Sequence, residues 1–330
     1  MGSVAATSMN QHEVPPTAGP RAFLRRLRHG DEVAYLITLT FAALILLITS
    51  LLVFELWTKS QLSREKFGWA FFYTRVWDAN FDNFGALPFI YGTMLTAVIS
   101  LVLAVPLGLA AAIFLSELAP RRVSATISFL IDLLAAVPSV IYGLLGIFIV
   151  VPLMRSTIGP ALKSALGFLP MFSGPNYGVG FLTAGIVLAI MVVPFIISVS
   201  REVLMTVPRE QREAAMALGA TRWEATWQVV VPWARSGIMG SIFLALARAL
   251  GETMAVTMVI GNDPKISASL FAPGYTIAAV IANEFTEATG NLYLSALIEL
   301  GLVLFLMTFI LNGLGRLLLV ATERGGGHPS

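Results

Sequence analysis

The sequence contains no cysteine, which excludes disulfide bridges, thiolate catalysis and cysteine-based metal sites. Charged residues are also scarce, at 12% of 330 residues, which is about half of what an average soluble domain carries. The three histidines, His12, His29 and His328, all lie in the terminal regions, so no histidine metal site is predicted. The net charge is only +2 and the basic residues are scattered, which argues against nucleic-acid binding.

Motifs of the common nucleotide-binding and hydrolytic sites are missing as well. There is no Gly-rich phosphate loop of the type G-x-x-x-x-G-K-S/T, so ATP would have to be bound and hydrolysed by another chain. No G-x-S-x-G segment occurs, and an intramembrane enzyme would have no nucleophile–base pair. We therefore expect a protein that is not an enzyme and that holds neither a metal nor a cofactor of its own.

The sequence does contain long hydrophobic runs. Hydrophobic residues make up 57% of the chain, and several runs reach about 20 residues, enough to cross roughly 30 Å of hydrocarbon as a helix. Six membrane-spanning helices are predicted, with the third interrupted at Pro138, at residues 33–54, 89–115, 124–153, 181–199, 237–260 and 292–320. The predicted fold class is an all-α polytopic protein of the cytoplasmic (inner) membrane.

Arginine and lysine are distributed unevenly between the two sides of these helices. Thirteen lie in the N-terminal segment, the second-to-third and fourth-to-fifth connections and the C-terminal end, against seven in the other connections. Because cytoplasmic segments carry the excess of basic residues, both termini and the loop 203–225 are predicted to be cytoplasmic. The predicted organisation is a disordered cytoplasmic tail at 1–32, a first helix and long external loop at 33–88, the main transmembrane domain at 89–320 and a cytoplasmic tail at 321–330.

The loop 203–225 carries strong helix signals. Pro208 suits the first turn of a helix, where its missing N–H costs nothing. Glu210 and Glu213 complement the positive end of the helix dipole. Gly219 is placed to end the helix in a left-handed conformation. A helix over about 208–218 is therefore predicted.

The same loop continues with a second helix and a small apolar face. Ala214, Ala215 and Leu218 share one face at helical spacing. Thr221 with Glu224 three residues later forms a capping-box pattern, which predicts that a second helix starts there. The expected shape is a helix–turn–helix with a tip of small residues that another protein surface could approach closely.

This pattern, Glu213-Ala214-Ala215-x3-Gly219-x9-V-V-V-P, resembles the cytoplasmic loop of ABC importer permeases, E-A-A-x3-G-x9-I-x-L-P. Over about 84–316 the chain is similar to PstC-type permease subunits of phosphate-specific ABC importers. Four runs carry this resemblance: FGALPFIYGT (84–93), AAVPSVIYG (135–143), RALGETMAV (248–256) and IANEF (281–285). The resemblance implies the six-helix permease fold of the MetI-like type and a role in ATP-driven import of inorganic phosphate.

The same resemblance implies partners and roles for the loop. The chain would pair with a second, PstA-like permease subunit and receive phosphate from an external PstS-like binding protein. Two PstB-like ATPase subunits would bind ATP and Mg²⁺. One of them would dock on the loop through Glu213, Ala214, Ala215, Leu218 and Gly219.

Arg248 and Glu252 are charges near the middle of the fifth predicted span. Being four residues apart, they are expected to share one helix face. An arginine at the bilayer centre costs roughly 2.5–3.5 kcal/mol, so it needs a partner, a cavity or a task. One interpretation is that the two side chains neutralise each other or neighbouring helices. The other, which the resemblance implies, is that Arg248 faces the translocation path and binds the anion.

The sequence leaves the roles of several other polar residues open. Ser139, Tyr142 and Thr253 could provide hydroxyl groups to an anion or simply pack. Asn283 and Glu284 could form a re-entrant gate or belong to a loop.

Three further questions stay open. Asp132 is expected to pair with Arg121 or Arg122 at the cytoplasmic end. The long outer connections, with their many aromatics in 55–88, could be interfacial turns or a docking surface for an external protein. Alternative functions are a permease for another oxyanion, or an ion-coupled secondary carrier, although the latter would not need the helical loop.

Overall fold

The computed structural model describes residues 31–325, and the chain divides into two compact units, residues 1–55 and 56–330. Helix α2 (Asp31–Lys59) begins in the first unit, is apolar and is long enough to cross a membrane. The tails predicted at 1–32 and 321–330 lie outside the described residues, except that 31–32 belong to α2 and 321–325 belong to the last helix, α16 (Asn291–Gly325).

The connection after α2 is folded rather than an open loop. It contains two short helices and a hairpin of two antiparallel strands: α3 (Gln61–Phe67), α4 (Ala70–Tyr73), β1 (Trp77–Asp78) and β2 (Asn83–Phe84). The ring of Trp77 packs edge-on against the rings of Phe84 and Phe89, with centroids 4.9 and 4.8 Å apart. Phe71, Phe84 and Phe89 are fully buried and form a small core, whereas Trp69, Tyr73 and Phe81 are exposed.

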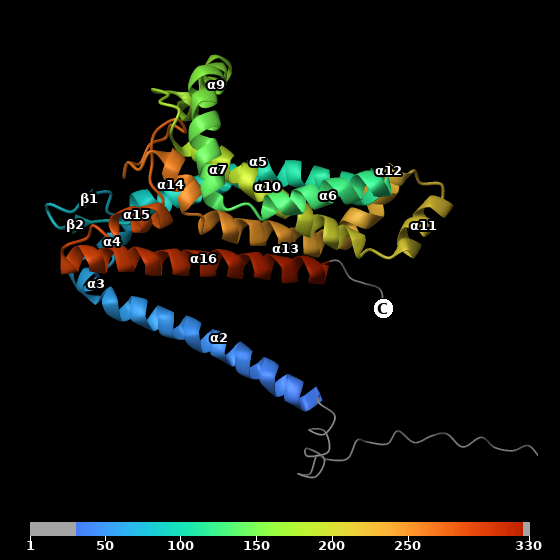
Figure 1. Ribbon diagram of the computed structural model, residues 1–330, viewed down its shortest axis with the longest axis horizontal. Helices are drawn as coiled ribbons and strands as arrows, with labels where there is room; N and C mark the ends of the chain where they lie inside the picture. The colour runs from blue at the N-terminus through green and yellow to red at the C-terminus, as the bar shows by residue number, and fades with distance from the viewer. Residues whose placement is uncertain (1–30, 326–330) are drawn as a thin grey trace, which may run out of the picture. The chain divides into compact units, whose positions relative to one another are not determined.

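Four long helices run side by side in the second unit (Figure 1), namely α5 (Leu87–Ile113), α10 (Phe181–Met205), α13 (Val231–Leu250) and α16. Helix α10 is the central one and packs on both α5 and α13. Its side chains Leu188, Met191 and Ile196 are almost completely buried. Gly185 on α10 faces Ile99 of α5 so closely that a Cβ would collide with it. Small residues at such contacts allow close packing, which drives helix association in lipid.

The third predicted span, 124–153, is wrong in its boundaries. Helix α6 (Arg121–Ala135) ends before Pro138, and a new rod then runs to Leu166. The rod contains α-helical and π-helical turns: α7 (Ser139–Leu145), η2 (Gly146–Val150), α8 (Val151–Leu153), η3 (Met154–Ile158) and α9 (Gly159–Leu166). The predicted interruption at Pro138 is confirmed. Proline lacks the N–H and restricts the residue before it, which ends α6.

The rod and the bundle differ in direction. In Figure 1, α9 runs across the direction of α5, α10 and α16, whereas α6 runs along it. The candidate span by length and composition is Ser139–Leu166, because α6 carries Arg121, Arg122 and Asp132 among its fifteen residues. The sequence pattern therefore joined most of α6 to about half of the rod.

The prediction of one continuous helix over 237–260 is also wrong. The segment before it contains α11 (Arg209–Ala217), α12 (Arg222–Ala225) and the π-helical turn η5 (Thr226–Val230), which leads into α13. Helix α13 ends at Leu250, and α14 (Met254–Ile260) starts after a break at 251–253. The carboxylate of Glu252 accepts a hydrogen bond from the Ala255 N–H at 3.1 Å, which fixes the new helix start.

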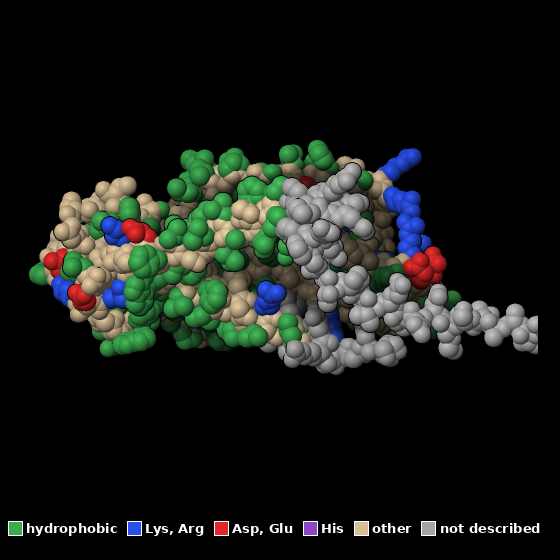
Figure 2. Space-filling view, turned by 90° about the horizontal axis from the view of Figure 1, so that it is seen from below, with side chains coloured by type: hydrophobic (Ala, Val, Ile, Leu, Met, Phe, Trp, Pro, Cys, Tyr) green, Lys and Arg blue, Asp and Glu red, His purple; other side chains and the backbone are tan. Residues whose placement is uncertain are grey.

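Six helices in the described part of the chain are long and apolar enough to cross a membrane, which confirms the predicted number: Ala34–Lys59, Leu87–Leu118, Ser139–Leu166, Phe181–Met205, Arg222–Leu250 and Asn291–Leu317. Figure 2 shows apolar side chains over the middle of one face, with most charged side chains gathered toward its two ends. This distribution suits a protein whose middle lies in hydrocarbon.

Candidate functional site

The helical loop predicted at 203–225 has the shape that the sequence indicated. Helix α11 follows Pro208 and carries Glu210 in its first turn. Gly219 adopts a φ of 94°, the left-handed conformation that favours glycine. Thr221 and Glu224 form both hydrogen bonds of a capping box at the start of α12. The helix–turn–helix prediction is confirmed residue by residue.

The tip of this loop is exposed and apolar. Leu218 is 91% exposed, and Ala214 is also exposed while Ala215 is half-buried. A Cβ on Gly219 would meet nothing within 4 Å.

One arginine fastens α11 to the membrane helices. Arg212 binds Glu117 through two parallel hydrogen bonds of 2.9 and 2.7 Å. Glu117 belongs to the π-helical turn η1 (Phe114–Leu118) at the end of α5. The same guanidinium donates to the carbonyl of Leu204 at 2.9 Å, in the last turn of α10. Arg212 thus joins the loop to the ends of two membrane helices.

This anchor was not identified from the sequence, where Arg212 was only one of the basic residues that set the orientation. Glu117 lies 95 residues away, and no local pattern connects the two. The side chains are 20% and 8% exposed. Because this ion pair is bidentate and largely buried, it fixes the position of α11 relative to η1 more strongly than a surface ion pair would.

Arg248 lies at the second candidate site, in the last turn of α13 beside the break at 251–253. It is half-buried and forms no ion pair with any residue in the described range. Its guanidinium carbon lies 5.7 Å from the centre of the Phe195 ring on α10. The expected pairing with Glu252 on one helix face is wrong, because the helix ends between the two residues.

Two helix breaks meet at this place. Helices α7 and α14 start after the breaks at 136–138 and 251–253 and pack on each other, with Gly143 against Met258 and Ala255. Irregular backbone at membrane depth is tolerated where it is buried in protein or lines a cavity, so this junction is a candidate for the transport path.

The remaining residues predicted for the path are placed as follows. Ser139 is the first residue of α7, directly after the break. The Tyr142 hydroxyl donates to the Leu134 carbonyl at 2.7 Å and so holds the two sides of that break together. Thr253 precedes α14, and its hydroxyl donates to the Gly251 carbonyl at 3.4 Å. Glu252 caps α14, where its negative charge complements the helix dipole.

Asn283 and Glu284 lie at the end of a short helix, α15 (Ile277–Glu284). Glu284 accepts hydrogen bonds from the Trp77 indole at 2.8 Å and the Tyr293 hydroxyl at 2.6 Å. The Asn283 amide donates to the Tyr275 hydroxyl at 3.0 Å, and burial raises the pKa of Tyr275 to about 12. These contacts tie α15 to the hairpin and to α16.

Asp132 has a different partner from the one expected. The hydroxyl of Ser198 on α10 donates to its carboxylate at 2.7 Å, and neither Arg121 nor Arg122 forms an ion pair with it within the described residues. Arg121 and Arg122 begin α6 and Asp132 is near its end. The helix itself therefore holds these charges about three turns apart.

Comparison with known proteins settles the family. Residues 104–321 match the model of the "binding-protein-dependent transport system inner membrane component" family. The chain belongs to this family of transport permeases. It is therefore a multi-pass inner-membrane protein and one component of a transport system.

Two relatives of this permease are similar over nearly their whole length. "Phosphate transport system permease protein PstC" of Mesorhizobium japonicum is 44% identical over 95% of this chain and 97% of its own. The protein of that name from Xylella fastidiosa, strain Temecula1, is 47% identical over 92% of this chain and 95% of its own.

A solved structure shows the same fold. A chain of a bacterial ABC transporter involved in import of the acidic polysaccharide alginate matches 88% of this permease and 98% of that chain, with a TM-score of 0.57 at 16% identity. The predicted fold of an ABC importer permease is confirmed.

Proposed function

We propose that this chain is the membrane permease subunit of an ATP-driven importer that moves inorganic phosphate across the cytoplasmic membrane. The observation that carries this proposal is the similarity, at 44% and 47% identity over nearly full length, to proteins named as phosphate transport permeases. The half-buried Arg248 without an ion pair in the described residues supports an anionic cargo, because a guanidinium fork binds oxyanions in a bidentate manner.

The proposed orientation of the chain in the membrane follows from its charge distribution. Thirteen basic residues against seven favour a cytoplasmic position for both termini and for α11. One of two PstB-like ATPase subunits would contact the exposed tip around Glu213, Ala214, Ala215, Leu218 and Gly219, and would bind ATP and Mg²⁺ itself. A PstA-like permease would complete the path, and a PstS-like protein would deliver phosphate from outside.

Arg212 gives this assembly a mechanical connection. Movement of α11 by the ATPase is transmitted to η1 through Glu117 and to α10 through the Leu204 carbonyl. Helix α10 packs on α14 and α7, which flank the junction at Arg248. Closure of the ATPases would therefore tilt the helices around the anion path and expose it to alternate sides.

The proposed cargo is tested by uptake of radiolabelled phosphate into vesicles that hold this chain with its transport-system partners. Uptake should require ATP and resist an excess of sulfate. Full competition by sulfate would show a permease for another oxyanion. Uptake driven by an ion gradient without ATP would show a secondary carrier, the other alternative considered from the sequence.

Gly219 offers a test of the docking surface. We expect Gly219→Val to weaken ATPase binding about tenfold, because a left-handed conformation costs a side-chain residue roughly 1–2 kcal/mol. The measurement is co-purification of the ATPase at graded concentrations. Gly240→Val is the matched control, since Gly240 also has no atom within 4 Å of an added Cβ but lies inside α13 at a helical φ. Equal ATPase binding by both variants would refute the docking role.

Glu252 offers a test of selectivity. A carboxylate can accept the proton that phosphate keeps near neutral pH, whereas sulfate has no such proton. Glu252→Gln keeps an oxygen for the Ala255 N–H and removes only the charge. We expect sulfate to inhibit phosphate uptake about tenfold more strongly in this variant, the size of one lost charged hydrogen bond. Glu287→Gln, at an exposed position, is the control, and unchanged sulfate inhibition would remove Glu252 from the selectivity mechanism.

A further inference from the structure

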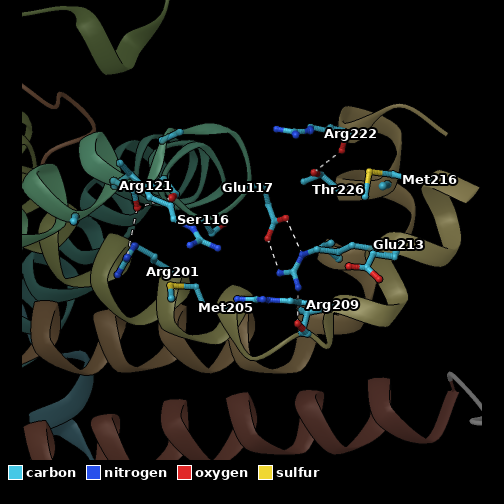
Figure 3. Close-up of a pocket in the computed structure, with 18 residues that line it drawn as sticks. Ser116, Glu117, Arg121, Arg201, Met205, Arg209, Glu213, Met216, Arg222 and Thr226 are labelled. Atoms are coloured by element: carbon cyan, nitrogen blue, oxygen red, sulfur yellow. Dashed lines mark hydrogen bonds and ion pairs between the residues drawn. The ribbon is translucent and has the colours of Figure 1, made fainter.

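A cavity of about 550 Å³ lies between the α11 loop and the ends of the membrane helices. Its walls come from η1, the start of α6, the end of α10, α11 and the α12–η5 segment. Five arginines line it: Arg121, Arg201, Arg209, Arg212 and Arg222. In Figure 3, Arg121 and Arg201 lie on one side of Glu117, and Arg209 and Arg222 lie on the other. The cavity is thus bounded by cationic groups on two sides.

The positive charge of this cavity is not balanced from within. Two glutamates, Glu117 and Glu213, also line it, so five positive charges face two negative ones and three remain. Arg212 and Glu117 are bound to each other. The other four arginines form no ion pair with any residue between 31 and 325. A concave site with an excess of one charge concentrates ions of the opposite sign.

Arg201 gives a second observation that points to an anionic ligand. Its side chain is half-buried, and its Nε is completely buried without a hydrogen-bond partner. Its Nη2 donates only a long bond of 3.5 Å to the Ser124 hydroxyl, which itself donates to the Leu115 carbonyl at 2.7 Å. A buried donor on a charged group is costly when it stays unsatisfied. An anion in the cavity would compensate the charge of this guanidinium group.

Three tryptophans place the cavity at the level of lipid headgroups. Trp223 and Trp227 stand edge to face with ring centroids 5.5 Å apart, and Trp233 follows on α13. All three are about half exposed, at 53%, 45% and 44%. Half-exposed tryptophans collect at the membrane–water boundary, and Trp223 directly follows Arg222, which lines the cavity.

We propose that this arginine-lined cavity binds a phosphate group, carried either by free inorganic phosphate or by the headgroup of an anionic phospholipid. Four guanidinium groups without carboxylate partners match the bidentate geometry of phosphate oxygens. Glu213 of the proposed ATPase contact lines this cavity, whereas Leu218, the exposed residue at the loop tip, does not. The inference rests on the proposed function only for the side of the membrane that the cavity faces.

The consequence differs with the source of the phosphate group. Free phosphate would bind on the side where imported phosphate accumulates, next to the Arg212–Glu117 contact that links the loop to the helices. The site would then act as a product sensor. A phospholipid would instead hold the loop at the membrane surface.

The experiment uses the full-length chain purified with its co-expressed transport partners in nanodiscs. Binding of radiolabelled inorganic phosphate is measured in nanodiscs of neutral phosphatidylcholine. Bound phosphatidylglycerol is measured by mass spectrometry after purification from native membranes. The variants are Arg121→Gln and Arg201→Gln, and the control is Arg75→Gln, an exposed arginine far along the chain in the hairpin region. All samples are repeated with Arg248→Ala, so that binding in the proposed transport path is removed separately.

We expect each cavity variant to weaken binding of the phosphate group about tenfold, the effect of one lost charge-assisted contact. Phosphate bound in neutral nanodiscs and lost in both variants identifies free phosphate. Phosphatidylglycerol that co-purifies and is lost in both variants identifies a lipid. The proposal is overturned if neither ligand binds, or if the cavity variants bind as much ligand as Arg75→Gln does. Retention in the cavity of an acidic segment of the ATPase would overturn it as well. If binding persists in the Arg248→Ala background, the cavity binds the phosphate group independently of the proposed transport path, and the result stands whether or not the proposed function is correct.

Discussion

Arg248→Ala is expected to reduce phosphate uptake by about two orders of magnitude, while membrane insertion and ATPase binding stay normal. Two charge-assisted hydrogen bonds to an oxyanion, at roughly 1.5 kcal/mol each, account for this factor. Replacing Arg248 by alanine leaves no carboxylate without its partner, because Arg248 forms no ion pair within residues 31–325. Uptake of labelled phosphate into vesicles is the measurement.

Two further variants make the Arg248 result specific. Arg248→Lys keeps the charge and loses the fork, so uptake should lie between the wild-type and alanine values. Arg155→Ala, at an exposed position in η3, should leave uptake unchanged. Wild-type uptake by Arg248→Ala would refute the assignment of the path, whereas loss of insertion would indicate a packing role on the Phe195 ring.

Arg212→Gln is expected to uncouple ATP hydrolysis from transport and to destabilise the α11 loop. Removing one partner of a buried ion pair costs roughly 3–5 kcal/mol, because the other charge stays unpaired, and the partial exposure of Arg212 lowers this figure. We expect ATPase binding to persist while phosphate moved per ATP falls more than about tenfold. Transport and hydrolysis are measured together in proteoliposomes.

The Glu117→Gln and Arg212→Gln double variant separates charge from anchoring. It removes both charges, so it should be more stable than Arg212→Gln alone. Transport should stay uncoupled, since the link between α11 and η1 is gone. The control is Lys265→Gln in the exposed Lys265–Asp263 pair at 3.0 Å, for which at most about 1 kcal/mol is expected. Full coupling in Arg212→Gln would remove this contact from force transmission.

The sequence described the α11 loop well because its signals are local. Pro208, Gly219 and the Thr221–Glu224 capping box each act within one helical turn, and each is found as predicted. The break at Pro138 was predicted for the same reason. The six apolar helices followed from length alone, since each must satisfy its own backbone in lipid.

Helix boundaries failed where two segments of similar composition meet. The pattern merged α6 with the following rod, and α13 with α14, because hydropathy does not register a change of direction. The start of α14 is set by the Glu252 carboxylate, which accepts a hydrogen bond from the Ala255 N–H. Arg248 and Glu252, expected to share one helix face, therefore lie in α13 and in the break that follows it.

The sequence by itself determined the membrane fold, the helical loop at 208–225 and the family, because apolar length, caps and short motifs are properties of neighbouring residues. Only the tertiary structure decided that Arg212 binds Glu117, 95 positions away, and that Arg248 lies at the junction of two helix breaks. It also decided that four arginines without an ion pair among residues 31–325 share one cavity. Such contacts depend on the packing of α5, α6, α10 and α11. Their energies come from burial and from the absence of a competing partner, which no stretch of sequence specifies.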